Sequence, residues 1–207
     1  MLRFHYAANT CALASHIVLE CVGAAYEGVR LSFADSQQRS PAYLALNPKG
    51  RVPALETDRG VLTETPAILA FLAQRFPEAG LAPLDDPFAF AEVQAFNAYL
   101  CATVHVAHAH RMRGYRWASD AASLADMQRK VPQSIGDAFG LIEHGLLKGK
   151  WVMGEAFTIC DPYLFTLAQW LEADGVDPAT LPRIADHRRR MSALPAVRAA
   201  IGQEMAD

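Results

Sequence analysis

The chain has 207 residues, of which 52% are hydrophobic and 20% are charged, and its formal net charge is -3. This composition is typical of a globular protein with a sizeable core and excludes a disordered chain. The small negative charge, without any block of Lys and Arg, argues against nucleic-acid binding, and no apolar stretch approaches the roughly 20 residues of a membrane span.

The cysteines and the first residues indicate a reducing compartment. Residues 1–6 lack the long apolar run of a signal peptide. The four cysteines lie far apart and form no C-x-x-C pair, which fits free thiols better than a disulfide framework: Cys11, Cys21, Cys101 and Cys160. We therefore expect a cytoplasmic protein.

Strand and helix patterns alternate in the first third of the chain. Gly23 follows the first apolar helical stripe, where a helix C-cap is expected, and Asp58-Arg59-Gly60 closes a hairpin. In chain order the patterns predict a strand at 2–6, a helix after Cys11, a strand at 26–33, a short helix at 40–46, strands at 52–57 and 61–63, and a helix from 65 towards 77.

Strand patterns stop after a linker rich in Pro, Gly and Asp at residues 78–87. The remainder predicts helices at 88–113, 121–147, 161–173, 181–191 and 195–203. We therefore predict an α/β domain at residues 1–77 and an all-α domain at residues 88–207, joined by that linker.

Cys11 is the first residue whose position suggests chemistry. A thiol at a helix N-terminus faces free backbone N–H groups and the positive end of the helix dipole, and both favour the thiolate. The same donors would stabilise the thiolate of a bound ligand. A buried structural cysteine is the alternative, and position alone does not separate the two.

Val52-Pro53 is an unusual entry into a strand, because proline cannot donate a hydrogen bond to the sheet. At a turn into a sheet edge this peptide bond can be cis. The backbone of Val52 could then pair with an extended peptide by strand addition. A structural edge proline is the alternative.

Glu64-Thr65-Pro66 places a carboxylate, a hydroxyl and free N–H groups together at a helix start. Glu64 could bind the ammonium group of an amino acid and Thr65 its carboxylate. Ordinary capping, with Thr65 as N-cap and Pro66 in the first turn, is the alternative. Capping alone gives Glu64 no role.

Histidines cluster in the first helix of the all-α region. His105 and His108 share a helix face at spacing i, i+3, and His110 follows. Metal binding would need i, i+4 histidines or further ligands at matching spacing, so we predict no metal site. A polar face that lines a cleft is the better interpretation. Arginines 111, 113 and 116 follow; they are solvated or could attract an anionic ligand.

Thr158-Ile159-Cys160-Asp161 fits an N-capping box with Asp in the usual Glu place. Thr158 would cap the N–H of residue 161, and Asp161 would return to the backbone of Thr158. We predict a structural role for both.

Taken together, residues 11–16, 47–55, 63–65 and 157–161 resemble the cytosolic glutathione transferases, and within them the bacterial beta class. The resemblance covers essentially the whole chain. It implies a thioredoxin-like N-terminal domain with a mixed four-stranded sheet, an all-helical C-terminal domain and a homodimer.

The resemblance also implies how glutathione is bound. Val52 with cis Pro53 pairs with the cysteinyl backbone of glutathione, Glu64 and Thr65 hold its γ-glutamyl end, and Lys49 lies near its glycine end. Thr65 stands where the family most often has Ser, and the hydroxyl is retained.

The chemistry implied by the resemblance centres on the glutathione sulfur. Cys11 matches the beta-class cysteine that lies beside this sulfur and can form a mixed disulfide with it, and His105 matches the histidine that reaches it. Tyr6, His108 and Met112 are candidates for the second, hydrophobic substrate site. The segment 108–117 differs from the beta-class pattern, so the acceptor stays open.

The predicted function is conjugation of the glutathione thiolate, as co-substrate, to a small hydrophobic electrophile. Cys11 and His105 would be the catalytic residues. Two alternatives stay open. The first is thiol-disulfide exchange or peroxide reduction through a mixed disulfide of Cys11 with glutathione. The second is that the chain is a non-catalytic glutathione-binding or regulatory protein.

Overall fold

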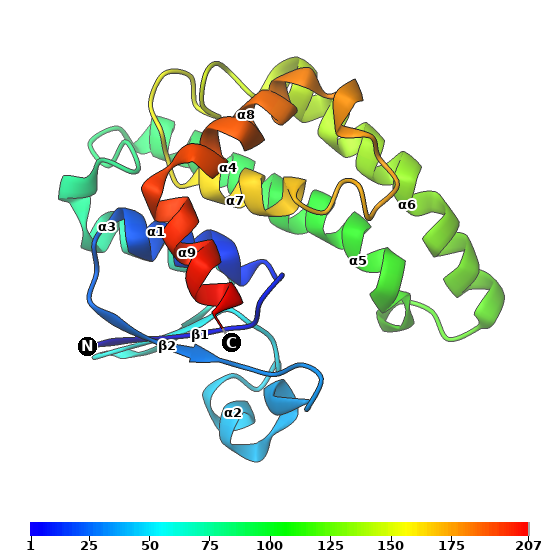
Figure 1. Ribbon diagram of the computed structural model, residues 1–207, viewed down its shortest axis with the longest axis horizontal. Coiled ribbons are helices and arrows are strands. Elements are labelled where there is room, and N and C mark those ends of the chain that lie inside the picture. Colours follow the sequence, from blue (N-terminus) through cyan, green and yellow to red (C-terminus); the bar gives the residue numbers. More distant parts are fainter. Residues whose placement is uncertain (207) are drawn as a thin grey trace.

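The computed structural model describes residues 1–206. The N-terminal part forms a four-stranded mixed sheet with three helices (Figure 1). Its elements in chain order are β1 (Leu2–Tyr6), α1 (Ala12–Cys21), β2 (Tyr26–Arg30), α2 (Pro41–Leu46), β3 (Ala54–Thr57), β4 (Gly60–Thr63) and α3 (Thr65–Arg75).

The sheet has the strand order β2-β1-β3-β4. β1 pairs parallel with β2 and antiparallel with β3, and β4 closes the hairpin with β3. α1 and α3 lie on one side of the sheet and α2 lies on the other (Figure 1). This is the predicted thioredoxin-like arrangement, and the predicted fold class is confirmed.

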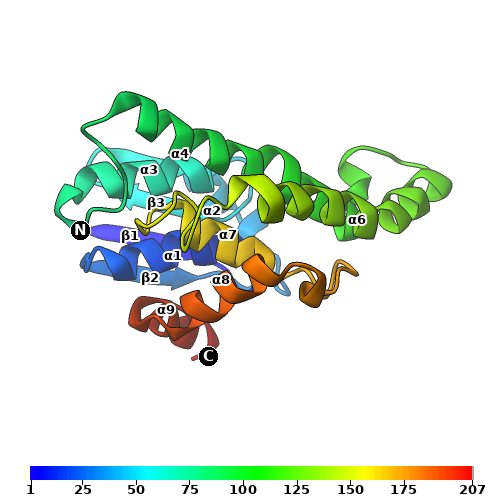
Figure 2. The ribbon, with the colours of Figure 1, turned by 90° about the horizontal axis from the view of Figure 1, so that it is seen from above.

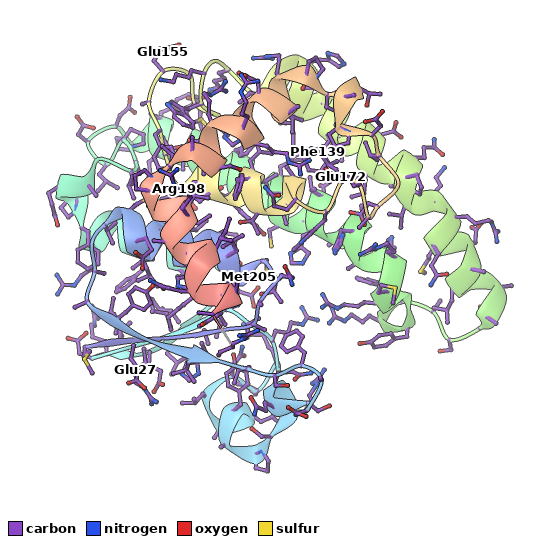
Figure 3. The ribbon with its side chains drawn as sticks, in the orientation of Figure 1. Glu27, Phe139, Glu155, Glu172, Arg198 and Met205 are labelled. Carbon is purple, nitrogen blue, oxygen red and sulfur yellow. The ribbon has the colours of Figure 1, made fainter. Side chains whose placement is uncertain are left out.

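Helices make up the C-terminal part. They are α4 (Pro87–Tyr99), α5 (His105–Arg113), α6 (Ala121–Leu141), α7 (Cys160–Ala168), α8 (Pro182–Ala193) and α9 (Pro195–Met205). α5 and α6 form an antiparallel pair that extends beyond the sheet, as Figures 1 and 2 show. Figure 3 places Phe139 of α6 within the helical part, where it is buried.

Several predicted element boundaries are wrong. The helix predicted at 121–147 ends as an α-helix at Leu141 and continues as a π-helical segment at Ile142–Leu146. The strand predicted at 52–57 begins at Ala54, directly after the cis peptide bond.

The strand predicted at 26–33 ends at Arg30, because its partner β1 ends at Tyr6, opposite Arg30. The helix predicted at 88–113 is interrupted by a π-helical segment at Leu100–Val104. The helix predicted at 161–173 ends at Ala168 and continues as turns towards Gly175, whose φ is 83°.

The hydrophobic core runs through both parts of the chain. One cluster of buried side chains extends from Phe4 in β1 to Leu164 in α7. A second cluster joins α1 to α7, α8 and α9 and contains Ile17, Phe165 and Met191. The division into two domains at residues 78–87 stays a prediction, since the buried core does not stop there.

α9 returns to the N-terminal part and packs against α1 (Figure 1). The buried His16 of α1 contacts this helix through its ring nitrogens: Nδ1 lies 3.2 Å from Glu204 Oε1 and Nε2 lies 2.7 Å from Gln203 Oε1. Met205 lies at the C-terminal end of α9 (Figure 3). The two ends of the chain therefore stabilise one another. None of the helices within residues 1–206 is both long and apolar enough to span a membrane.

Candidate active site

Two adjoining cavities lie where the sheet domain meets α5. The first, of about 140 Å³, contains six predicted site residues: Cys11, Val52, Pro53, Glu64, Thr65 and His105. The second, of about 340 Å³, shares Cys11, Val52 and His105 with the first. The structure therefore brings together side chains from α1, the turn before β3, the start of α3 and the start of α5.

Cys11 is the residue before α1 and is partly exposed in both cavities. Its sulfur donates to the carbonyl of Val52 across 3.6 Å. Burial raises the pKa of the Cys11 thiol to about 11, although a hydrogen bond from Thr65 and the positive charge of Arg113 act in the opposite direction. The sequence favoured a thiolate at Cys11, whereas the raised pKa indicates a protonated thiol at pH 7, because desolvation by burial is the largest effect.

His105 opens α5 and its ring lies 5.4 Å from the Trp170 ring. Burial lowers the pKa of the His105 imidazole to about 4, and the positive charges of His108, Arg113, Arg116 and Arg51 lower it further. His105 is therefore neutral at pH 7. A neutral imidazole has one N–H donor and one free nitrogen lone pair.

The peptide bond between Val52 and Pro53 is cis, as the sequence suggested. The turn before it is fixed by two hydrogen bonds to the carbonyl of Arg51, one from Tyr43 Oη and one from Asn47 Nδ2, each 2.7 Å long. β3 begins directly afterwards at Ala54. The backbone of Val52 therefore lies at the cavity wall, just before the strand.

Glu64 precedes α3 in an unusual conformation, with φ 72° and ψ 122°. A non-glycine residue rarely adopts such a φ, and strain of this kind concentrates at binding sites. Thr65 is the first residue of the helix, one position later than the predicted N-cap, and no side-chain capping bond is formed at Glu64. Thr65 is buried, and its hydroxyl lowers the pKa of the Cys11 thiol.

Lys49 is not in either cavity lining but pairs with a site residue. Its Nζ donates to Glu64 Oε1 at 2.5 Å and to Thr63 Oγ1 at 2.6 Å. Both side chains of this ion pair are exposed. The expected position of Lys49 near the glycine end of glutathione stays a prediction.

The three candidates for a second-substrate site have different positions. His108 lines the larger cavity, and its Nδ1 lies 2.7 Å from Asp174 Oδ2. Tyr6 lies in the core at 6% exposure and stacks on Phe4. Met112 is 73% exposed on α5 and contributes to neither cavity. The expectation is therefore wrong for Tyr6, whose strand faces the core, and for Met112, which faces solvent.

Several lining residues were missed from the sequence. Cys101 and Tyr163 line the first cavity, and Phe33, Arg39, Tyr115 and Trp170 line the second. Helical spacing could have found Cys101, which lies one turn before His105. Nothing local marks the others, since elements far apart in the sequence bring them together.

The predicted capping box lies away from the cavities, at the start of α7. Asp161 accepts the backbone N–H of Thr158 at 2.8 Å, in the expected direction. Thr158 Oγ1 accepts the N–H of Cys160 rather than that of Asp161. Asp161 also accepts the N–H of Val152 at 2.8 Å and lies 3.0 Å from His187 Nε2.

Within residues 1–206, no group of three or more His, Cys, Asp or Glu side chains is placed to hold a metal ion. The functional groups that line the two cavities include two thiols, two imidazoles, the carboxylate of Glu64, several hydroxyls and four guanidinium groups.

Comparison with known proteins gives one consistent family. The model of the glutathione S-transferase N-terminal domain matches residues 3–74. Glutathione S-transferase GstA of Escherichia coli O157:H7 is 29% identical over 206 residues, which are 98% of each chain.

Solved structures agree over the full length. A glutathione transferase homologue from Sulfitobacter, with bound glutathione, is 42% identical with a TM-score of 0.95 and 99% of each chain covered. A beta-class glutathione S-transferase from Sphingomonas chungbukensis is 28% identical with a TM-score of 0.86, covering 99% of this chain and 100% of that one.

Proposed function

The chain belongs to the glutathione S-transferase family. From this premise we propose that it binds glutathione and conjugates the glutathione thiolate to a small electrophile. The observation that carries the proposal is the cavity that gathers Cys11, Val52, Glu64, Thr65 and His105. The backbone of Val52 before β3, the start of α3, and the side chains of Cys11 and His105 meet there.

Glutathione would lie extended across the cavity wall. The backbone of Val52 would pair with its cysteinyl residue, as in strand addition. The start of α3 would bind the α-carboxylate of the γ-glutamyl end through Thr65, and Glu64 would bind the ammonium group. The ion pair with Lys49 would have to open for Glu64 to do so. The glycyl end then points away from Thr65, past Val52.

Cys11 would act as a neutral hydrogen-bond donor. Because its pKa is raised, the Cys11 thiol keeps its proton at pH 7 and can donate to the glutathione sulfur in place of the Val52 carbonyl. The N–H of the neutral His105 ring would donate a hydrogen bond to the glutathione sulfur. The thiol proton would pass to water, because an imidazole with a pKa of about 4 is a weak base. The thiolate then attacks the electrophilic carbon, an S–C bond forms, and the leaving group departs with its electron pair.

Replacement of the two residues tests the proposal. We expect His105→Ala to lower kcat/KM about tenfold to a hundredfold, because the glutathione thiolate loses a hydrogen-bond donor. Cys11→Ala should also lower kcat/KM, whereas Cys11→Ser, which keeps a donor, should be less impaired. Steady-state kinetics with glutathione and a chlorodinitrobenzene measure these effects, with circular dichroism as the check on folding.

Cys21→Ala is the matched control, because Cys21 is also a half-buried free cysteine but lines neither cavity. It should keep wild-type turnover. Wild-type turnover in both His105→Ala and Cys11→Ala would show that the assignment is incorrect.

Thiol-disulfide exchange is a second candidate, favoured by the presence of Cys101 in the same cavity as Cys11. Deprotonated Cys11 would attack the glutathione sulfur of a mixed disulfide between glutathione and a substrate thiol, which releases the substrate thiolate and leaves a mixed disulfide on Cys11. A second glutathione thiolate would then attack the glutathione sulfur of that disulfide, which releases Cys11 and oxidised glutathione. Intact-mass measurement after treatment with oxidised glutathione should give an adduct that Cys11→Ala abolishes; its absence would exclude this route.

The homodimer and the cytoplasmic location implied by the resemblance stay part of the proposal. Phe88, at the start of α4, is 75% exposed in the single chain, as an interface residue would be. Light scattering of the purified protein tests the dimer, and Phe88→Ser should shift it towards the monomer.

A further inference from the structure

The larger cavity beside Cys11 is lined by four arginines: Arg39, Arg51, Arg113 and Arg116. Its volume is about 340 Å³, and His108 and the neutral His105 line it as well. The remaining lining residues are polar, aromatic or small, and within the described chain none of them carries a carboxylate. A cavity for a purely hydrophobic acceptor would not have this lining.

Within the described part of the chain, the four arginines of the cavity have no acidic partner, although Asp174 lies 2.7 Å from the lining residue His108. In residues 1–206, none of its four arginines lies within 4.0 Å of a carboxylate, whereas Arg111 pairs with Asp174 and Arg188 with Glu172 nearby. Burial lowers the pKa of Arg116, and the charges of Arg51 and Arg113 lower it further. Clustered cations repel one another, and a bound anion would relieve this repulsion.

Glutathione itself accounts for part of this charge. In the proposed pose its glycyl carboxylate runs past Val52, towards Arg51 and Arg39 at the edge of the sheet domain. Arg113 ends α5 and Arg116 lies in the following turn, on the opposite wall of the cavity. In the proposed pose, no group of glutathione pairs with the guanidinium groups of Arg113 and Arg116.

We propose that the electrophile that accepts the glutathione sulfur is an anion, whose carboxylate is bound by Arg113 and Arg116. This inference rests on the proposed transferase function and names its substrate class. Phe33 and Trp170 line the same cavity and would contact the carbon skeleton. Guanidinium groups bind carboxylates with two parallel hydrogen bonds, so they would also orient the reacting carbon towards the sulfur.

Two matched electrophiles test the proposal: a chlorodinitrobenzoate and the corresponding neutral chlorodinitrobenzamide. In both, the glutathione sulfur attacks the ring carbon, the C–S bond forms, and chloride leaves with the bonding electrons. The wild-type protein should have a kcat/KM for the benzoate at least about tenfold above that for the amide, after correction for the uncatalysed rates.

The double variant Arg113→Gln/Arg116→Gln should reduce this benzoate-to-amide ratio by about tenfold or more, because a charge-assisted pair is lost. Arg129→Gln is the control, since Arg129 is an exposed arginine on α6 that pairs with Asp126. It should leave the ratio unchanged. Added salt should lower the ratio in the wild type more than in the double variant.

The outcomes separate the two proposals. Failure to conjugate either electrophile would overturn the transferase function itself. Turnover of both at equal kcat/KM, or an equal loss for both in the double variant, would overturn only the anionic acceptor. In the latter case the arginines stabilise the glutathione thiolate and do not select the acceptor.

Discussion

Cys11 and His105 both carry no charge at pH 7, because burial disfavours their ionised forms. Positive charges of Arg51, Arg113 and Arg116 act on His105, while the carboxylate of Glu64 lines the same cavity. A glutathione thiolate brought between Cys11 and His105 would therefore find a thiol donor and a neutral imidazole. With its raised pKa, Cys11 would donate to the substrate sulfur rather than compete as a nucleophile.

Alkylation of Cys11 tests this point. With a pKa of about 11, the Cys11 thiolate is roughly one part in ten thousand at pH 7, so reaction with iodoacetamide should be slow there and accelerate up to about pH 11. Peptide mass spectrometry measures the rate at Cys11 separately from the other cysteines, and bound glutathione should protect it. Rapid alkylation with an apparent pKa well below 9 would contradict the assignment.

His105 should make stability depend on pH. Its pKa is about 4 when folded and 6.5 when free, so between these values the unfolded chain takes up the proton first and unfolding is favoured as the pH falls. His105→Gln should therefore reduce the loss of stability between pH 6.5 and 4, measured as the urea midpoint. An identical pH slope in the variant and the wild type would show that His105 is not buried as a neutral group.

At the scale of elements, Asp161 connects three segments around the start of α7. Its carboxylate is fully buried and accepts the N–H groups of Thr158 and Val152, and it lies beside His187 of α8. The sequence predicted only the local bond to Thr158. The other two contacts hold the loop before α7 and the following helix in place.

Removal of this carboxylate should be costly. We expect Asp161→Ala to lower the free energy of unfolding by about 3–5 kcal/mol, because His187 and two backbone donors lose a buried partner. Thr158→Ala should cost only about 1 kcal/mol, since it removes one capping hydroxyl.

Urea denaturation measures both effects. Asp126→Ala, which removes an exposed pair with Arg129, is the control and should cost no more than about 1 kcal/mol. Equal losses of unfolding free energy for Asp161→Ala and Asp126→Ala would show that the buried contacts of Asp161 stabilise the fold no more than an exposed ion pair does.

At the scale of the whole molecule, the continuous core and the packing of α9 on α1 join the sheet part to the helical part. The active site lies between these two parts, so its geometry depends on that packing. The contacts of His16 with Gln203 and Glu204 connect the two parts by buried polar groups.

We therefore expect a single cooperative unfolding transition. All three tryptophans, Trp117, Trp151 and Trp170, lie in the helical part, so their fluorescence reports on that part alone. Hydrogen exchange of α1 and β1 reports on the sheet. The two urea midpoints should coincide, and His16→Ala should lower both together. If the two parts unfold at different urea midpoints and His16→Ala lowers only one of them, the sheet part and the helical part do not unfold as one unit.

The fold was largely predictable because its signals are local. Alternating and helical patterns identified the strands and helices, and Val52-Pro53 identified the cis turn. The boundaries that failed depend on partners: β2 ends where β1 ends, and α7 ends in turns that lead to Gly175.

By itself, the sequence determined the family, the order of elements and the residues of the sheet domain that gather at the site, since Cys11, Val52 and Thr65 lie in short local motifs. Only the tertiary structure decided the ionisation of Cys11, because burial depends on every neighbour. It alone also joined Arg51 of the sheet domain to Arg113 and Arg116 of the helical domain in one cavity. Charges distant in the sequence act as one group only when the packing of α5 against the sheet domain brings them together.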